Sequence, residues 1–291
     1  MLDTSELILT PRGTIYHLDL HPDEVADTII TVGAPERVPK VSRYFDRLEH
    51  TRMHREFVSH TGYIGRKRLT VVSTGIGPDN IDIVLNELDA LANIDFNSRS
   101  LKNALTSLTL IRLGTSGSLQ EDIPVGSMLA STFAIGLDNL LHYYVPENNA
   151  EETFLLHAFR QHTRFTGNPI QPYIAQASIH LLNHFTSDNY HHGITVTCPG
   201  FYAPQGRKLR SASAFPDLIP LLAGFHQGPH RLANLEMETA ALYGLSKLMG
   251  HHCVSISTIV TNRRDGTFSK DAGAEIDRMI KNALEIIEQL K

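Results

Sequence analysis

The sequence lacks the features of membrane, disulfide-rich and nucleic-acid-binding proteins. It has only two cysteines among 291 residues, Cys198 and Cys253, so we expect neither a disulfide framework nor a cysteine metal cluster. No apolar run reaches the roughly eighteen residues that span a bilayer, and residues 1–13 have no apolar core like that of a signal peptide. Acidic residues outnumber basic ones by 31 to 26, which argues against broad nucleic-acid binding. We therefore expect a globular, cytoplasmic protein with no nucleic-acid or membrane partner.

The sequence does contain a series of short, β-rich apolar runs that stop at glycine or small polar residues. They lie at residues 28–32, 69–74, 108–113, 194–198 and 254–260, and the first three stop before Gly33, Gly75 and Gly114. Continuous Val, Ile and Leu runs are typical of strands buried on both faces of an α/β sheet.

Helical periodicity occupies the segments between these runs. We expect a helix after Pro78 with Asp79 as its cap, a second helix over residues 235–249, and a third over residues 276–290. This alternation, without a break in composition, predicts a single α/β domain over residues 1–291. Residues 93–107 and 140–173 do not fit the alternation, so we interpret them as peripheral insertions.

Two of the strand ends carry candidate anion ligands, and the carboxyl ends of strands are where open α/β sheets bind ligands. Residues 33–37 (Gly-Ala-Pro-Glu-Arg) offer glycine amides, a helix start and the Arg37 guanidinium, although a plain turn with a surface arginine is the alternative. Arg112 stands in an apolar run just before residues 114–117 (Gly-Thr-Ser-Gly). A buried guanidinium needs an anionic partner, which is either a structural carboxylate or a bound phosphate. Neither segment is a Walker loop, and residues 75–77 lack the third glycine of a dinucleotide fingerprint.

Two further patterns leave the chemistry open. In residues 236–238 (Glu-Met-Glu), a carboxylate could accept two hydrogen bonds from a vicinal diol, although acidic residues also favour the first turn of any helix. Among sixteen histidines, four pairs stand at i, i+4 spacing, but none has an evident third ligand or the glutamate of a helical zinc site. We therefore expect no metal.

The order of these segments along the chain resembles the nucleoside phosphorylase superfamily with a hexamer-type core. The matching stretches are residues 33–37, 54–57, 73–77, 112–117 and 236–238. Residues 201–207 (Phe-Tyr-Ala-Pro-Gln-Gly-Arg), followed by Asn262 and Arg263, resemble the members that act on uridine. The resemblance implies an α/β fold with a central mixed twisted sheet flanked by helices, and reversible phosphorolysis of uridine to uracil and ribose 1-phosphate. It implies inorganic phosphate as co-substrate and no other cofactor.

The resemblance also implies a role for each matching position. The implied phosphate ligands are Gly33, Arg37, Arg55, Arg112 and Thr115, with Arg55 donated by a neighbouring subunit. The implied ribose ligands are His17, Glu236, Met237 and Glu238, with His17 reaching the ribose 5′-hydroxyl from the partner. The implied base ligands are Phe201, Gln205, Arg207 and Arg263. Catalytic roles are implied for Arg112, Thr115, Glu238 and Arg263. The partner expected is a second copy, in a homodimer with shared sites that assembles into a hexamer unless the insertions block it.

Three departures from the family pattern bear on specificity. Residues 261–264 (Thr-Asn-Arg-Arg) replace the Ser-Asp pair of purine members and Asp265 is off register, which favours a pyrimidine. Residues 77–80 (Gly-Pro-Asp-Asn) differ from the Gly-Gly-Pro-Ser pattern, which argues against a bacterial-type monovalent-cation site. Ala203-Pro204 replaces Pro-Gly, which leaves uridine, deoxyuridine and thymidine open. The alternatives are a hydrolase or purine phosphorylase on the same scaffold, or a non-catalytic nucleoside-binding protein.

Overall fold

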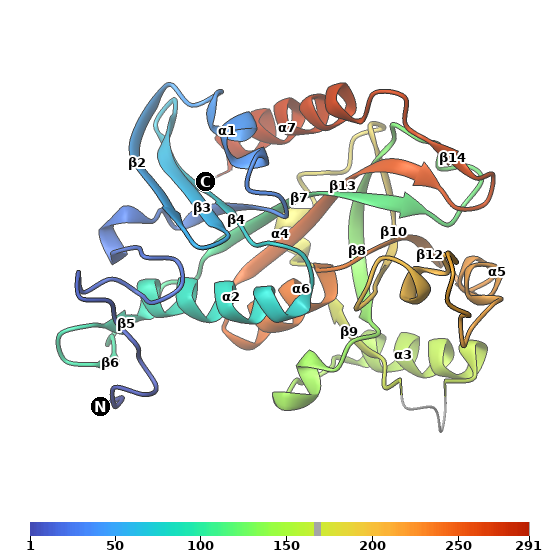
Figure 1. The fold of residues 1–291 in the computed structure, drawn as a ribbon, viewed down its shortest axis with the longest axis horizontal. Helices are drawn as coiled ribbons and strands as arrows, with labels where there is room; N and C mark the ends of the chain where they lie inside the picture. The colour runs from blue at the N-terminus through green and yellow to red at the C-terminus, as the bar shows by residue number, and fades with distance from the viewer. Residues whose placement is uncertain (166–169, 291) are drawn as a thin grey trace.

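The centre of the protein is a large mixed β-sheet with helices on both sides (Figure 1). The computed structural model describes residues 1–165 and 170–290. Within these residues twelve strands form one sheet, and β5 (Ile94–Asp95) pairs with β6 (Ser100–Leu101) in a separate hairpin. The sheet contains β1 (Thr28–Val32), β2 (Arg47–His54), β3 (Phe57–Ile64), β4 (Lys67–Ser73), β7 (Thr109–Ser118), β8 (Met128–Gly136), β9 (Tyr173–Gln176), β10 (Tyr190–Thr197), β11 (His226–Gln227), β12 (His230–Glu236), β13 (His252–Asn262) and β14 (Thr267–Phe268).

Parallel pairing places several strand ends on the same edge of this sheet. Strands β4, β1, β7 and β13 are parallel neighbours, and so are β8, β10 and β12. Antiparallel pairing of β13 with β8 joins the two sets, and a second antiparallel contact pairs Asn234 and Leu235 of β12 with Ser118 and Gly117 of β7. This last contact closes the five strands β7, β13, β8, β10 and β12 into a ring. It brings residues 112–118 close to residues 234–238.

Helices cover both faces of the sheet because alternate residues of the central strands point to opposite sides. Ile29 of β1 packs in a core with α2 and α6, whereas Ile30 packs in a core with α1 and α7. Figure 1 shows these two pairs of helices on opposite sides of the central strands. The helices are α1 (Arg37–Ser42), α2 (Pro78–Asn93), α3 (Ala150–Thr163), α4 (Ile179–Leu182), α5 (Leu218–Ala223), α6 (Thr239–Leu248) and α7 (Ala272–Gln289), with 3₁₀ turns η1 (Pro22–Glu24), η2 (Leu140–Tyr143) and η3 (Ala203–Gln205). No described helix is long and apolar enough to cross a membrane.

The predicted fold class is confirmed, and each predicted strand exists, but several boundaries were wrong. Strand β7 does not stop at Gly114; it runs on to Ser118 because it pairs with β13 over its whole length. The helix expected from residue 235 begins at Thr239, because residues 235–236 still pair with β10. Asp79 does not cap α2: it lies in the first turn, and Gly77 occupies the N-cap position.

The two segments predicted to be insertions have regular structure in the described residues. Residues 93–107 contain the β5–β6 hairpin. Residues 140–173 contain η2 and α3, a helix that begins with reciprocal hydrogen bonds between Asn149 and Glu152 and buries Leu155 and Phe159. Residues 166–169 of this range lie outside the described residues. That both segments are insertions, and that residues 1–291 form one domain, stay predictions.

Candidate active site

A polar cavity opens where the carboxyl ends of β1, β7, β12 and β13 meet. Its volume is about 250 Å³. Ten of the thirteen residues predicted from the sequence line it: Gly33, Arg37, Arg112, Thr115, Phe201, Gln205, Arg207, Glu236, Met237 and Glu238. An eleventh, Arg263, adjoins it and donates from Nη1 to the backbone oxygen of Gln205 at 2.8 Å. Residues from all three predicted sets, for phosphate, ribose and base, therefore converge on one cavity.

Arg112 is neutralised by carboxylates of its own chain. Its Nη2 donates to Oε2 of Glu238 at 2.5 Å and lies 3.0 Å from Oε2 of Glu236, and all three side chains are buried. Burial disfavours the charged guanidinium, but Glu236 and Glu238 outweigh it and raise the pKa of Arg112 above its ordinary value. Of the two partners that the sequence left open for Arg112, the structure contains the structural carboxylate.

Arg37 carries a positive charge that no carboxylate in the described residues pairs. It projects from the start of α1, and its Nη1 donates to the backbone oxygen of Leu113 at 3.2 Å. Burial, and then repulsion from Arg112, lower the pKa of Arg37 below its ordinary value. These two effects outweigh the attraction of the more distant carboxylates Glu36 and Glu238. An anion that enters the cavity would therefore stabilise the charged form of Arg37.

Glu236 is engaged on both of its carboxylate oxygens. Oε1 accepts from the hydroxyl of Thr197 at 2.6 Å, and Oε2 accepts from the backbone N–H groups of Glu238 and Thr239 at 2.8 and 2.9 Å. Glu236 thus ends β12 and fixes the first turn of α6, which holds the backbone of Glu238. A contact between Glu236 and ribose stays a prediction.

Glu238 combines burial with a carboxylate that faces the cavity. Its Oε1 accepts the backbone N–H of Gly77 at 2.8 Å, and its Oε2 binds Arg112. Burial raises the pKa of Glu238; Arg112 lowers it only in part, because one guanidinium is shared between two carboxylates. The site therefore holds a carboxylate with a raised proton affinity beside the free cation of Arg37.

At the other end of the cavity, Arg207 fixes the side chain of Gln205. Arg207 stacks on the ring of Phe201 at 3.7 Å and donates from Nη1 to Oε1 of Gln205 at 2.7 Å. Burial and the neighbouring Arg263 lower the pKa of Arg207 to about 10, and burial also lowers that of Arg263. The carboxamide of Gln205 is consequently held with its oxygen on Arg207 and its nitrogen free to donate.

Two predicted site residues, His17 and Arg55, do not line this cavity. Arg55, in the turn between β2 and β3, donates to the hydroxyl of Tyr16 at 3.1 Å, and Nδ1 of His17 lies 2.6 Å from Glu87. The two segments touch, since Nδ1 of His54 donates to the backbone oxygen of His17 at 2.9 Å. The prediction that both residues serve a neighbouring subunit's site is the one that fits this placement, and it stays a prediction.

Several cavity residues were missed by sequence reasoning. Ser116 and Gly117 stand inside a motif already singled out, so their position next to Thr115 was the available signal. Phe268, on the short strand β14, is 69% exposed although it is a large aromatic at the cavity mouth. No pattern in its own segment marks it, because β14 reaches the cavity only through its pairing with β13.

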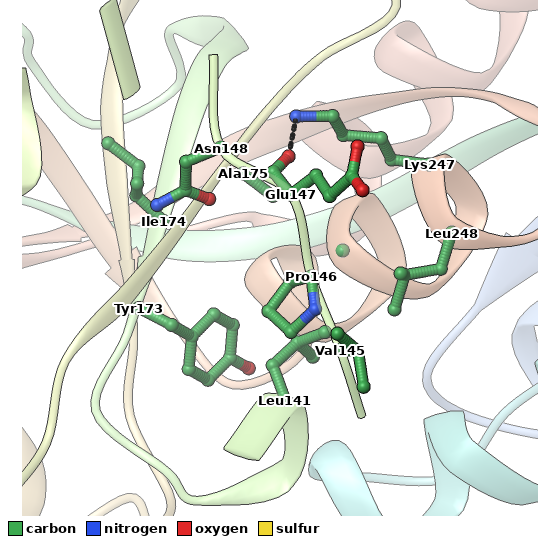
Figure 2. Close-up of a pocket in the computed structure, with 11 residues that line it drawn as sticks. Leu141, Val145, Pro146, Glu147, Asn148, Tyr173, Ile174, Ala175, Lys247 and Leu248 are labelled. Atoms are coloured by element: carbon green, nitrogen blue, oxygen red, sulfur yellow. Dashed lines mark hydrogen bonds between the residues drawn. The ribbon is translucent and has the colours of Figure 1, made fainter. Parts of the chain in front are cut away.

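A second cavity, of about 320 Å³, lies between η2, β9 and α6 (Figure 2). It contains none of the predicted site residues. Lys247, at its rim, donates to the backbone oxygen of Glu147 at 2.7 Å and pairs with buried Glu152 at 2.6 Å. The cation of Lys247 is therefore already paired within its own chain.

The fold and the first cavity together define an α/β protein that presents an unpaired cation, a buried carboxylate and an oriented amide to a small polar ligand. A family model described as the phosphorylase superfamily matches residues 27–290, and the chain belongs to this superfamily. The resemblance seen in the sequence is thereby confirmed.

Individual relatives agree with this assignment. A protein named uridine phosphorylase from Thermococcus kodakarensis is 27% identical over 96% of this chain and 89% of its own length. A uridine phosphorylase from Haemophilus influenzae is 26% identical over 89% of this chain and 90% of its own length. The solved structure of a Trypanosoma brucei nucleoside phosphorylase, whose description states that it shows uridine phosphorylase activity, superimposes with a TM-score of 0.86. That protein is 30% identical over 97% of this chain and 98% of its own.

Proposed function

We propose that this chain is a uridine phosphorylase, which converts uridine and inorganic phosphate to uracil and ribose 1-phosphate. The observation that carries the proposal is that unpaired Arg37, carboxylate Glu238 and oriented Gln205 all face one cavity. These three groups match the phosphate, the ribose diol and the pyrimidine edge of the two substrates. The relatives named above are uridine phosphorylases, which supports the choice of reaction.

Phosphate is placed at the Arg37 end of the cavity. The guanidinium of Arg37, the amide of Gly33 and the hydroxyl of Thr115 supply donors of the type that bind a phosphate dianion. Arg112 bridges this end to the sugar, because its Nη2 already holds Glu238. In this arrangement Glu238 binds the 2′- and 3′-hydroxyls of ribose, and Met237 packs beside the sugar.

The reaction needs one bond formed and one broken at the anomeric carbon. A phosphate oxygen bonds to C1′ while the bond from C1′ to N1 of uracil breaks and its electron pair leaves with the base. Charge develops on the uracil carbonyl, where Arg207 and Arg263 stabilise it, and the uracil anion then takes a proton from solvent. Gln205 pairs its amide with the uracil edge. Because uracil leaves as a stable anion, no cofactor is required.

The structure disfavours purine chemistry in the described residues. Asn262 is committed to the backbone oxygens of Gln120 and Ile123, at 2.9 and 3.2 Å. The carboxylate of Asp265 is exposed and accepts from the backbone and hydroxyl of Thr267. Neither side chain is placed to protonate a departing purine.

The proposal also covers the oligomeric state and the cellular location. The placement of His17 and Arg55 outside the cavity supports a homodimer with shared active sites, although a hexamer of such dimers remains compatible with the fold. The two cysteines are both free, which supports a reducing, cytoplasmic location.

The direct test is a product assay with uridine, deoxyuridine, thymidine and inosine, each with and without phosphate. The expected result is phosphate-dependent release of uracil from uridine, and little turnover of inosine. Base release that ignores phosphate would instead identify a hydrolase. Tight uridine binding without turnover at any phosphate concentration would identify a non-catalytic binding protein.

A further inference from the structure

We propose that Glu87, on α2, is a positioning residue that fixes the imidazole of His17 in one tautomer and one orientation. The inference rests on the proposed function only for the use of His17. Glu87 itself lies outside the cavity described above and has 9% of its surface exposed. Glu87 contacts the N-terminal segment that carries His17.

The contacts of Glu87 converge on two consecutive residues. Its Oε1 and Oε2 lie 2.9 and 3.0 Å from the backbone nitrogen of His17, and Oε2 accepts the backbone N–H of Leu18 at 2.8 Å. Its Oε1 also lies 2.6 Å from Nδ1 of the His17 ring. A single carboxylate thereby holds both the main chain and the side chain of His17.

The ring contact determines where the imidazole proton resides. An ionised carboxylate only accepts hydrogen bonds, so Nδ1 of His17 must carry a hydrogen. In the part of the chain that the structure describes, Nε2 of His17 has no hydrogen-bond partner, and the side chain is 29% exposed. The ring also packs edge-to-face with the ring of Tyr16, at 4.9 Å between ring centroids. Nε2 is therefore presented outward as an oriented acceptor.

This arrangement suits recognition of a hydroxyl group. In the shared-site homodimer, Nε2 accepts from the 5′-hydroxyl of the ribose bound in the neighbouring subunit. Carboxylate–histidine pairs serve this purpose elsewhere, since the carboxylate fixes the tautomer and the aim of the ring. Glu87 then acts on substrate binding through His17 and never touches the substrate.

The test compares Glu87→Gln with the matched variant Asp82→Asn. Asp82 is on the same helix, and its carboxylate binds Tyr144 and Asn86 instead of His17. Glutamine keeps the size of Glu87 but replaces one acceptor oxygen with an amide that only donates. We expect Glu87→Gln to raise KM for uridine about tenfold, the loss of roughly one oriented hydrogen bond, with kcat much less affected. For 5′-deoxyuridine, which lacks the hydroxyl, we expect no change, and for Asp82→Asn no change with either substrate.

Equal losses for uridine and 5′-deoxyuridine would show a merely structural role and overturn the proposal. A second measurement does not depend on turnover. In ¹⁵N-histidine-labelled wild-type protein, the His17 signal, assigned by its absence in His17→Gln, should show a protonated Nδ1 and an unprotonated Nε2. The opposite tautomer would overturn the proposal even if uridine is cleaved. Failure of the wild type to cleave uridine, with this tautomer present, would instead reject only the proposed function.

Discussion

At the scale of single residues, charge balance distinguishes the two arginines of the cavity, Arg37 and Arg112. Arg112 is shared between Glu236 and Glu238, whereas Arg37 has only the backbone oxygen of Leu113. Removing Arg112 leaves two buried carboxylates without a paired cation, a type of change that destabilises by about 3–5 kcal/mol. Substitutions of Arg112 therefore mix loss of folding with loss of binding. Arg37 is the informative position.

We predict that Arg37→Met raises KM for phosphate by about tenfold or more, because one charge-assisted contact to the dianion is lost. The melting temperature should change little, since no ion pair of Arg37 is broken. Steady-state kinetics with varied phosphate at saturating uridine measures the effect. The control is Arg43→Met, at the other end of α1, where the exposed guanidinium pairs with half-buried Asp277. An unchanged phosphate KM in Arg37→Met would contradict the proposed position of phosphate.

The sequence could predict which residues gather here, but not how their charges pair. Arg112 stood out because a guanidinium in an apolar strand needs an anionic partner. The sequence could not distinguish a structural carboxylate from a bound phosphate as that partner. The choice depends on β12 ending beside β7, through the pairing of Leu235 with Gly117, a contact between residues more than a hundred positions apart. No local pattern encodes such a contact.

A second residue-scale prediction concerns Asp138, which follows β8. Its carboxylate accepts from the Tyr173 hydroxyl at 2.8 Å and from the backbone of Leu140, but burial dominates and raises its pKa. The folded state thus binds this proton more tightly than the unfolded state, so stability falls as pH rises from about 3.9, the ordinary aspartate value, through the raised pKa. Asparagine does not ionise, so Asp138→Asn removes this pH-dependent loss of stability.

We therefore expect the melting temperature of Asp138→Asn, relative to wild type, to be higher at pH 7 than at pH 4. Thermal unfolding across this range measures the difference. Asp265→Asn is the control of opposite sign, because hydrogen bonds from Thr267 lower the pKa of Asp265 and its ionised form favours folding. A relative melting temperature of Asp138→Asn that falls as pH rises would show that the buried carboxylate is stabilised as an anion.

At the scale of elements, strand β7 shows why a glycine need not end a strand. The sequence predicted a stop at Gly114, yet β7 continues to Ser118. A Cβ at Gly114 would lie 1.9 Å from Nη1 of Arg112, so the missing side chain provides the space for that guanidinium. Glycine is therefore needed at position 114 because the Arg112 guanidinium packs against it. The sequence pattern of a small residue after an apolar run does not distinguish this cause from a turn.

We predict that Gly114→Ala displaces the Arg112 guanidinium from Glu238 and lowers kcat/KM for uridine by at least about a hundredfold, because the contacts of both substrates are disturbed. Gly273→Ala, in α7 and outside the cavity, is the comparison: its Cβ would meet the nearest heavy atom, Oδ1 of Asp271, at 3.4 Å, an ordinary contact. Kinetics of both variants, with melting temperatures to establish folding, measures the effect. Near-normal activity of Gly114→Ala would mean that Arg112 need not occupy its observed position.

At the scale of the whole molecule, the residues expected to act together do not all meet within one chain. Eleven of them surround or adjoin the cavity, while His17 and Arg55 form their own cluster with Tyr16, His54 and Glu87. The sequence resemblance predicted this division by assigning two residues to a neighbouring subunit. Composition and periodicity could not have done so, because neither records which surface faces another copy.

The proposed division of residues between two subunits can be tested with two variants that are impaired at low phosphate. In the proposed homodimer, Arg37→Met would damage the cavity of its own chain, and Arg55→Met would damage the cavity of the partner. In a two-fold symmetric mixed dimer, both lesions fall in one site and the other site is intact. Random reassembly after mild dissociation makes about half of the dimers mixed. At a phosphate concentration well below the raised KM, about a quarter of wild-type activity should therefore return. Mixing Arg37→Met with Gln205→Ala, both in the same cavity, is the control and should restore nothing. Absence of recovery in the first mixture, with mixed dimers demonstrated by mass, would place Arg55 outside the active site and leave each cavity complete within its own chain.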